Sequence, residues 1–178
     1  MPKLIENAKE LILETSEKLL FKVGYKGFKI REVAKCCGIA TGTIFNYFDS
    51  KEMLIATIMA KDWANFLVEI QKECSLATDI AAGVSAIYNG IDTFCKKYEP
   101  IWRGYSGNLI GQFGKYHVTL RQQIADILST LLLRFNIKED MSVVSIFAEA
   151  ILASAVQKDI DLPSLLKFTS LLFPSKVK

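Results

Sequence analysis

The sequence predicts an all-α protein with a small N-terminal domain of helix-turn-helix type and a larger C-terminal helical domain. Apolar residues recur at helical spacing in successive segments, and a glycine ends two of them where a helix stop is expected. The chain has 178 residues, 51% of them hydrophobic, which suffices for two helical domains that share a junction. We expect the first domain to span residues 1–49 and the second to span residues 50–178.

Three helices are expected in the first domain. The first runs from about Leu4 to Val23 and is stopped by Gly24. The second spans residues 30–37, and Gly38 supplies the left-handed turn after it because glycine accepts a positive φ without steric cost. The third spans Thr41–Tyr47 and is too short to be stable alone, so its neighbours must hold it in place.

The third segment presents small polar and aromatic residues, while Ile44 and Phe48 are expected to point inward. The amide of Asn46 can pair with adenine through two hydrogen bonds, and threonine methyl groups can contact thymine. A glycine in this helix lets the backbone approach a phosphate closely. The alternative interpretation is a plain helical hairpin with no role in DNA binding. The predicted DNA-binding residues are Lys29, Arg31, Thr41, Gly42, Thr43, Asn46, Tyr47 and Lys51.

Positive charge is concentrated in the first domain. Residues 1–51 hold nine lysines and arginines against six acids, whereas residues 52–178 hold thirteen of each. The entire net charge of +3 therefore lies in the first 51 residues. Such a surface suits phosphates and predicts salt-sensitive binding, although a solvated helix face would have the same composition.

A series of short motifs runs through about the first 60 residues: Leu20-Phe21, Gly24-Tyr25, Ile30, Val33-Ala34, Gly38-Ile39, Gly42-Thr43, Tyr47-Phe48 and Lys51-Glu52. In this order, and without gaps, they resemble the N-terminal domain of the TetR family of transcriptional repressors. The resemblance implies a homodimer that binds a palindromic double-stranded DNA operator. It also implies a variable all-helical second domain that dimerises and binds a small, largely apolar inducer, which moves the N-terminal domains and relieves repression.

Three residues depart from the family pattern. Phe28 and Ala40 stand where threonine and serine usually cap the second and third helices, and the loss of each cap costs about 1 kcal/mol. We expect Phe28 to pack under the domain, and Thr41 is the candidate to replace the second cap by shifting the helix start by one residue. Phe45 replaces a tyrosine whose hydroxyl contacts a phosphate, so that contact is absent here.

The second domain is expected to contain five helices. A long helix from Ser50 to about Cys74 connects the two domains, with Asp49 or Ser50 as its cap and Glu52 in its first turn. Pro100 and Pro163 are expected at first-turn positions. The remaining helices are predicted at about Thr78–Tyr98, Lys115–Phe135, Glu139–Lys158 and Pro163–Phe173.

The segment Pro100–Lys115 combines four glycines with aromatic rings, which could close around an apolar molecule. The alternative is a kinked helix whose rings fill the core. The predicted ligand-binding residues are Trp63, Phe66, Trp102, Tyr105, Phe113 and Tyr116.

The segment Glu139–Lys158 is apolar nearly all round and must be buried on more than one face. Small residues on it would let a second copy approach, so we expect an isologous four-helix dimer interface. Its predicted residues are Val144, Ala148, Ile151, Ala155, Leu165, Phe168 and Leu172.

No catalytic site is evident, because paired acids, a nucleophile with its base, and a phosphate loop are all missing. We expect no enzyme activity, no cofactor and no metal, and interpret the four cysteines as core residues; a redox role of Cys36 is the alternative. His117 is expected to have no carboxylate partner. No segment suits a membrane or a signal peptide, so the protein is expected in the cytoplasm. A helical enzyme or lipid carrier and an activator are the competing hypotheses.

Overall fold

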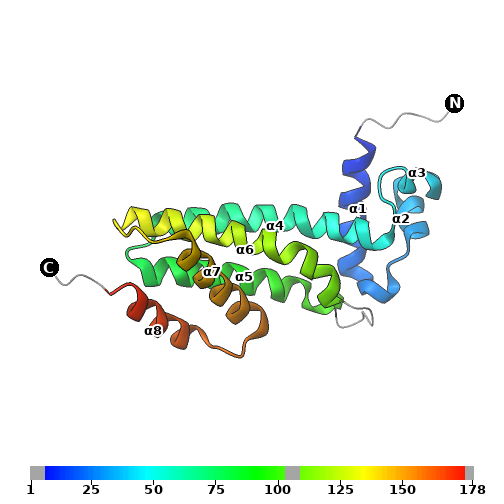
Figure 1. The fold of residues 1–178 in the computed structure, drawn as a ribbon. Coiled ribbons are helices and arrows are strands. Elements are labelled where there is room, and N and C mark those ends of the chain that lie inside the picture. The colour runs from blue at the N-terminus through cyan, green and yellow to red at the C-terminus, as the bar shows by residue number, and fades with distance from the viewer. Residues whose placement is uncertain (1–6, 103–108, 175–178) are drawn as a thin grey trace. The chain divides into compact units, whose positions relative to one another are not determined.

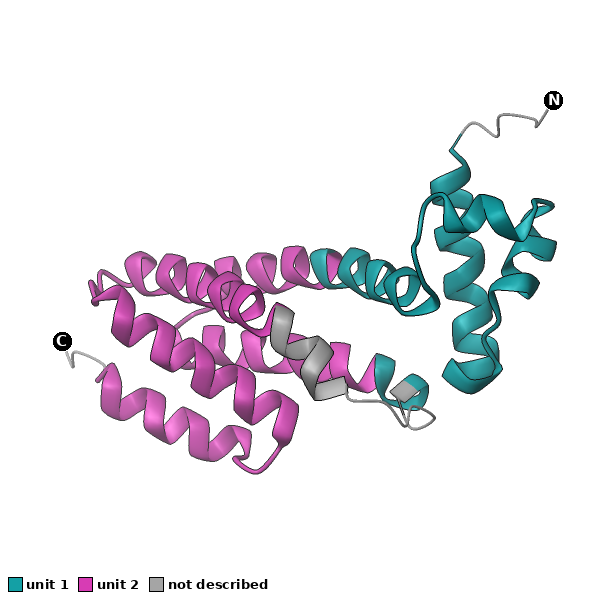
Figure 2. Cartoon of the chain, turned by 45° about the vertical axis from the view of Figure 1, so that its right-hand side comes forward, with its two compact units in different colours: residues 1–64, 98–106 teal, residues 65–97, 107–178 magenta. Residues whose placement is uncertain are grey.

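The computed structural model describes residues 7–102 and 109–174, and the side chains of residues 102 and 109–115 lie outside the description. The described residues form eight α-helices and no strand, so the predicted all-α class is confirmed (Figure 1). The chain divides into two compact units, drawn in different colours in Figure 2. Unit 1 comprises residues 1–64 and 98–106, and unit 2 comprises residues 65–97 and 107–178.

Unit 1 contains α1 (Ala8–Gly27), α2 (Ile30–Cys37), α3 (Thr41–Phe45) and the first part of α4 (Lys51–Leu76). Helix α1 is kinked at Gly24, whose φ of 67° is the left-handed conformation that favours glycine. The stop predicted at Gly24 is thus a kink, and the helix continues beyond it to Gly27. The core of this unit is made of large apolar side chains that are almost fully buried: Ile12, Leu20, Phe28, Val33, Ile44, Phe48 and Leu54.

Unit 1 extends beyond the boundary that the sequence suggested at residue 49. It takes in α4 up to Ala64 and the last residues of α5 (Ile80–Trp102). The buried Tyr98 of α5 donates a hydrogen bond to Asp62 Oδ2 of α4 at 2.7 Å. Its ring also lies 5.4 Å from that of Phe21 on α1. Burial, and then the hydrogen bond to the Asp62 carboxylate, raise the pKa of Tyr98, so this hydroxyl stays protonated and donating.

Unit 2 contains the rest of α4 and α5, together with α6 (Leu109–Arg134), α7 (Met141–Gln157) and α8 (Leu162–Leu172). Two glycines of α5 allow close helix contact. A Cβ at Gly83 would lie 2.4 Å from Leu131 of α6, and a Cβ at Gly90 would lie 2.3 Å from Ile70 of α4. Larger residues at these two positions would push the helices apart.

Aspartates cap the N-terminal starts of α7 and α8. Asp140 accepts a hydrogen bond from the Ser142 N–H at 2.7 Å, and Asp161 accepts one from the Ser164 N–H at 2.9 Å. These are N-cap contacts, which satisfy backbone donors that a helix start leaves free. Pro163 lies in the first turn of α8, as predicted.

Two of the helix predictions for the second domain are wrong at the same place. Helix α6 begins at Leu109, six residues before the predicted start at Lys115. Pro100 lies inside α5, near its end, rather than in the first turn of a helix. A proline there removes one backbone hydrogen bond of the helix, and the described helix continues to Trp102. In the described part of the chain, no helix is both long and apolar enough to cross a membrane.

Candidate nucleic-acid interface

Helices α2 and α3 form a rigid hairpin because each buries a small apolar face. Val33 and Ala34 of α2 are buried, and so is Ile44 of α3. Between the helices, Gly38 adopts φ 66°, and its N–H donates to Lys35 O at 3.2 Å. The next N–H, that of Ile39, donates to Ala34 O at 3.0 Å. This is the glycine-terminated helix end that the sequence predicted.

The outer side of the hairpin carries the predicted DNA-binding residues. Gly42, Asn46 and Tyr47 are exposed, and Thr41 and Thr43 are half-buried. Lys29, just before α2, and Arg31 in its first turn are also exposed. Apart from Lys51, the predicted residues thus lie on the surface of one compact unit with polar or charged groups available to a partner.

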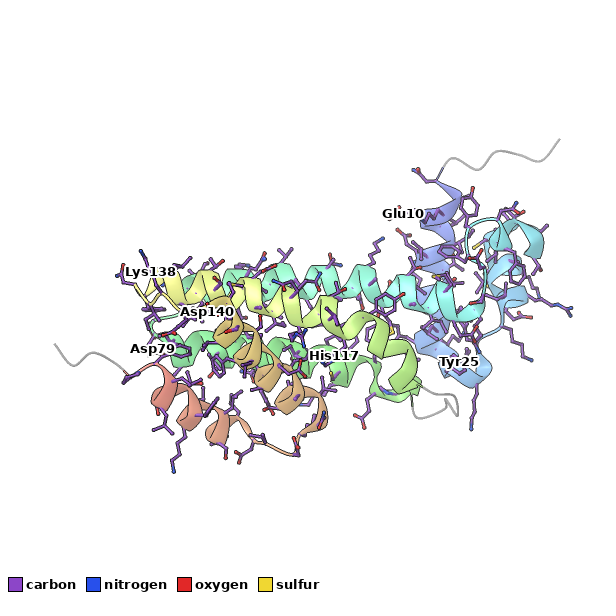
Figure 3. All side chains as sticks on the ribbon, viewed as in Figure 1. Glu10, Tyr25, Asp79, His117, Lys138 and Asp140 are labelled. Carbon is purple, nitrogen blue, oxygen red and sulfur yellow. The ribbon has the colours of Figure 1, made fainter. Side chains whose placement is uncertain are left out.

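Lys51 has a structural contact that the sequence did not suggest. Its Nζ donates to the backbone oxygen of Tyr25 at 2.6 Å and lies 3.8 Å from the centre of the Tyr25 ring. The Tyr25 hydroxyl in turn donates to Glu52 Oε1 at 2.7 Å. Figure 3 labels Tyr25 at the end of α1. The motifs Gly24-Tyr25 and Lys51-Glu52 are therefore the two sides of one contact, which we call the Tyr25 clasp.

Both charged groups of the clasp have a lowered pKa. Burial lowers the pKa of Lys51. The hydrogen bond from the Tyr25 hydroxyl lowers the pKa of Glu52 against the opposing effect of burial. Since an ammonium has three N–H donors, Lys51 can hold Tyr25 and still donate to a phosphate.

The two helix starts lack side-chain caps, as expected, but the N-cap residue of α2 is Lys29 and not Phe28, where the sequence placed it. Neither Lys29 nor Ala40, the N-cap residue of α3, makes a side-chain cap hydrogen bond. Phe28 is buried in the core of unit 1, as predicted. Thr41 does not replace the missing cap, because α3 begins at Thr41 with Ala40 still the N-cap residue. By contrast, Ser50 caps α4, since its Oγ accepts from the Met53 N–H at 3.1 Å.

The structure describes three of the six predicted ligand-binding side chains. Trp63 is buried in unit 1. Phe66 belongs to unit 2, where its ring packs edge-on against Phe94 at 5.5 Å. Tyr116 is exposed. The other three, Trp102, Tyr105 and Phe113, have side chains that lie outside the described residues.

The predicted dimer face of α7 is corrected by the structure. Val144, Ala148, Ile151 and Ala155 are buried within a single chain and have no surface left for a second copy. They face inward because α7 packs on both α6 and α8. Leu165 of α8 is buried for the same reason, whereas Phe168 is exposed and Leu172 is half-buried. The exposed apolar residues of these two helices are Met141, Ile146, Val156, Phe168 and Leu171.

Two further expectations about reactive residues are wrong. His117 of α6, labelled in Figure 3, does have a carboxylate partner, because its Nε2 lies 2.9 Å from both carboxylate oxygens of Glu149 on α7. Arg121 lies 3.8 Å from the same carboxylate. Of the four cysteines, only Cys74 is a buried core residue, and burial raises the pKa of its thiol to about 11. Cys36 is exposed.

No group of three or more histidine, cysteine or acidic side chains that could hold a metal ion occurs among the residues that the structure describes.

Known proteins share sequence similarity with the hairpin region. Residues 12–58 match the family described as bacterial regulatory proteins, tetR family. The uncharacterised HTH-type transcriptional regulator YuxN of Bacillus subtilis (strain 168) is 36% identical over 55 residues. That match covers 31% of this chain and 19% of YuxN. The similarity therefore spans less than a fifth of the length of YuxN.

Solved structures share the whole fold. A protein from Rhodococcus sp. RHA1, described as a transcriptional regulator, has a TM-score of 0.67 at 17% identity and is covered over 97% of its length by 96% of this chain. The transcriptional regulator FadR from Bacillus subtilis, in complex with stearoyl-CoA, has a TM-score of 0.56 at 16% identity, with 96% of this chain covering 100% of that one. At such low identity these likenesses show the fold alone.

Proposed function

We propose that this chain, whose residues 12–58 match the tetR family of bacterial regulatory proteins, is a dimeric repressor that leaves its operator when a small, largely apolar molecule binds. The observation that carries this proposal is the helix-turn-helix of unit 1, which buries Val33, Ala34 and Ile44 while Lys29, Arg31 and Asn46 are exposed. A regulator that reads chromosomal DNA would work in the cytoplasm. No step of this function needs a catalytic group or a cofactor.

The contacts to DNA divide into two kinds. We assign Lys29, Arg31 and Lys51 to phosphates, because cations that contact the backbone give affinity without reading sequence. We assign the contacts to base edges to α3 and the residues just after it, where Asn46 can pair with adenine. Tyr47, exposed just beyond α3, would donate its hydroxyl to a phosphate.

The salt dependence of binding tests this division. The full-length protein is used to select a binding site from a random pool of DNA duplexes, and its affinity for that duplex is measured over a range of salt concentrations. Arg31→Ala and Lys29→Ala should each reduce the slope of log affinity against log salt by about 1. Lys138→Ala removes an exposed lysine of unit 2 and is the matched control, with an unchanged slope expected. Unchanged slopes in all three variants, or no enriched duplex, would remove the DNA-binding assignment.

The apolar side chains left exposed on α7 and α8 support a two-fold dimer. Ile146 is 70% exposed and Leu171 is 72% exposed, although both belong to helices whose other sides are buried. Val143, Ile146, Ala150 and Ala153 recur at helical spacing along the open side of α7. An isologous contact would bury this stripe against its own copy and present two recognition helices to successive major grooves.

Mass measurement in solution tests the dimer. We expect the wild type to have a mass near twice that of the 19.9 kDa chain. Ile146→Glu and Leu171→Glu would place a charge in the interface and should give monomers with unchanged helix content. Val118→Glu alters an exposed valine of α6 and should leave the dimer intact. A dimer that persists in both glutamate variants would mean that another surface joins the subunits.

The ligand is proposed to be an acyl compound bound in unit 2. The support is the shared fold with FadR, which was solved with stearoyl-CoA, together with the aromatic contact of Phe66 and Phe94 in the same unit. Stearoyl-CoA should release the selected duplex, whereas coenzyme A without the acyl chain should not. If stearoyl-CoA binds but the protein has no affinity for DNA, a carrier function replaces the repressor.

A further inference from the structure

Helix α3 presents an apolar ring on the face that the proposed function assigns to DNA. Gly42, Phe45 and Asn46 are exposed and are spaced three and four residues apart, so they share one side of the helix. Phe45 is 47% exposed. Because a phenyl ring can neither donate nor accept a conventional hydrogen bond, its exposure on this face does not serve the contacts assigned to Asn46 or Tyr47.

Gly42 has no role in the fold that explains it. Unlike Gly24 and Gly38, it does not have a left-handed φ. Unlike Gly83 and Gly90, it has open space around it, since a Cβ built there would meet nothing within 4 Å. A glycine within a helix is destabilising relative to alanine. The missing side chain at Gly42 therefore leaves room for something that approaches from outside the chain.

We propose that Gly42 and Phe45 form a recess on α3 that reads thymine through its 5-methyl group. This inference rests on the proposed DNA-binding function and names one base that the protein selects. In the major groove, the thymine methyl group is the apolar group that base pairs present, and phenylalanine is among the side chains that contact it. Gly42 would admit the methyl group, and the ring of Phe45 would cover it. Phe45 is thus a specificity residue rather than only a lost phosphate contact.

The test removes single methyl groups from DNA. The duplex selected from a random pool by the full-length protein is resynthesised with each thymine in turn replaced by deoxyuridine, which keeps base pairing and all hydrogen-bonding groups. We expect the wild type to lose about fourfold in affinity at one or more positions in each half-site, the effect of one buried methyl-sized group. A selected site without thymine, or equal affinity for every uracil-containing duplex, would overturn the proposal.

Protein variants identify the group that contacts the methyl. Phe45→Ala should bind the thymine and uracil duplexes equally well, whereas Phe45→Leu should keep part of the difference. Tyr47→Ala is the matched control, because it removes a neighbouring exposed ring and should weaken binding to both duplexes by the same factor. A thymine preference that persists in Phe45→Ala would assign the methyl to another side chain and overturn the proposal.

Gly42→Ala tests the other half of the recess. We expect this variant to unfold at the same or a higher temperature than the wild type but to lose much of the difference between thymine and uracil. An unchanged preference would show that no recess is needed. Failure of this inference is distinct from failure of the proposed function: salt-sensitive binding without thymine discrimination sinks only the former, and absence of any DNA binding sinks both.

Discussion

Helix α3 has five residues, of which Ile44 is buried, whereas α7 has 17 residues, of which seven are buried. The two also start differently: α3 has no side-chain cap, while Asp140 caps α7. Because α3 has little to stabilise it, its position depends on the hairpin around it. In return, most of its side chains remain outside the core, where they can contact a partner.

Helix α7 shows the opposite use of side chains. Its buried residues contact neighbours within the chain, and Phe147 lies 6.0 Å from the ring of Phe168 and 5.5 Å from that of Phe173. The side of α7 that is left accessible to a partner is mainly the stripe of Val143, Ile146, Ala150 and Ala153. The comparison shows that an apolar pattern predicts which residues are buried. The residues that can contact a partner are those that are not buried within the chain.

The largest effect is expected where α7 packs most tightly. Phe147→Ala removes a ring that is 1% exposed and leaves a cavity between α7 and α8. The expected loss in the free energy of unfolding is about 3–5 kcal/mol, the range found for buried aromatic residues. Unfolding in urea, followed by helix content, measures this loss.

A neighbouring surface position provides the control for the cavity. Val118→Ala shortens an apolar side chain that is exposed on α6, and the expected change is within about 0.5 kcal/mol. Equal losses for the two variants would contradict the assignment of Phe147 to the core of unit 2.

A smaller and opposite effect is expected at the start of α3. Ala40 has the extended backbone of an N-cap residue, with φ −70° and ψ 146°, but no acceptor in its side chain. The Thr43 N–H already donates to the Ala40 backbone oxygen at 2.9 Å. Ala40→Ser would supply an oxygen for the N–H of Gly42 and should stabilise unit 1 by about 1 kcal/mol. Thermal unfolding measures the gain, and Ala40→Val is the control without an acceptor. A serine variant no more stable than the valine variant would mean that the helix start is fixed by tertiary contacts alone.

The sequence was sufficient for the helix-turn-helix because its signals are local. The glycine turn at Gly38, the buried Ile44 and the missing caps follow from residues a few positions apart, and the structure confirms each of them. The Tyr25 clasp could not be predicted in the same way, since Lys51 and Tyr25 are 26 residues apart. The sequence showed the motifs Gly24-Tyr25 and Lys51-Glu52 separately, but no rule about neighbouring residues predicts that they contact each other.

The face of α7 was assigned wrongly for a related reason. Val144 and Ile146 are both aliphatic, and periodicity gives two apolar sides without saying which one packs inside. The choice depends on α6 and α8, both of which pack against α7. The partner of His117 was missed likewise, because Glu149 lies 32 residues away. Nonlocal packing, rather than any weakness of the helical pattern, limits what the sequence predicts.

The smallest effect is expected in the Tyr25 clasp, and it should depend on pH. The folded-state pKa of Glu52 lies below its ordinary value of 4.5 because the Tyr25 hydroxyl donates to the carboxylate. The stability from this contact is therefore fully present above about pH 4.5 and is lost as the pH falls through the lower, folded-state pKa. Tyr25→Phe should cost about 0.5–1 kcal/mol at pH 7 and progressively less in acid.

Urea unfolding of the wild type and Tyr25→Phe at several pH values measures this difference. Ala40→Ser is a suitable comparison, since the cap that it adds at α3 involves only an uncharged N–H and its effect should be the same across the whole pH range. A Tyr25→Phe loss that stays constant into acid would show that the hydroxyl acts by packing rather than by holding the Glu52 carboxylate. A loss confined to neutral pH would instead identify the clasp as the charged contact that fixes the start of α4, the part of unit 1 that follows the exposed, weakly capped α3.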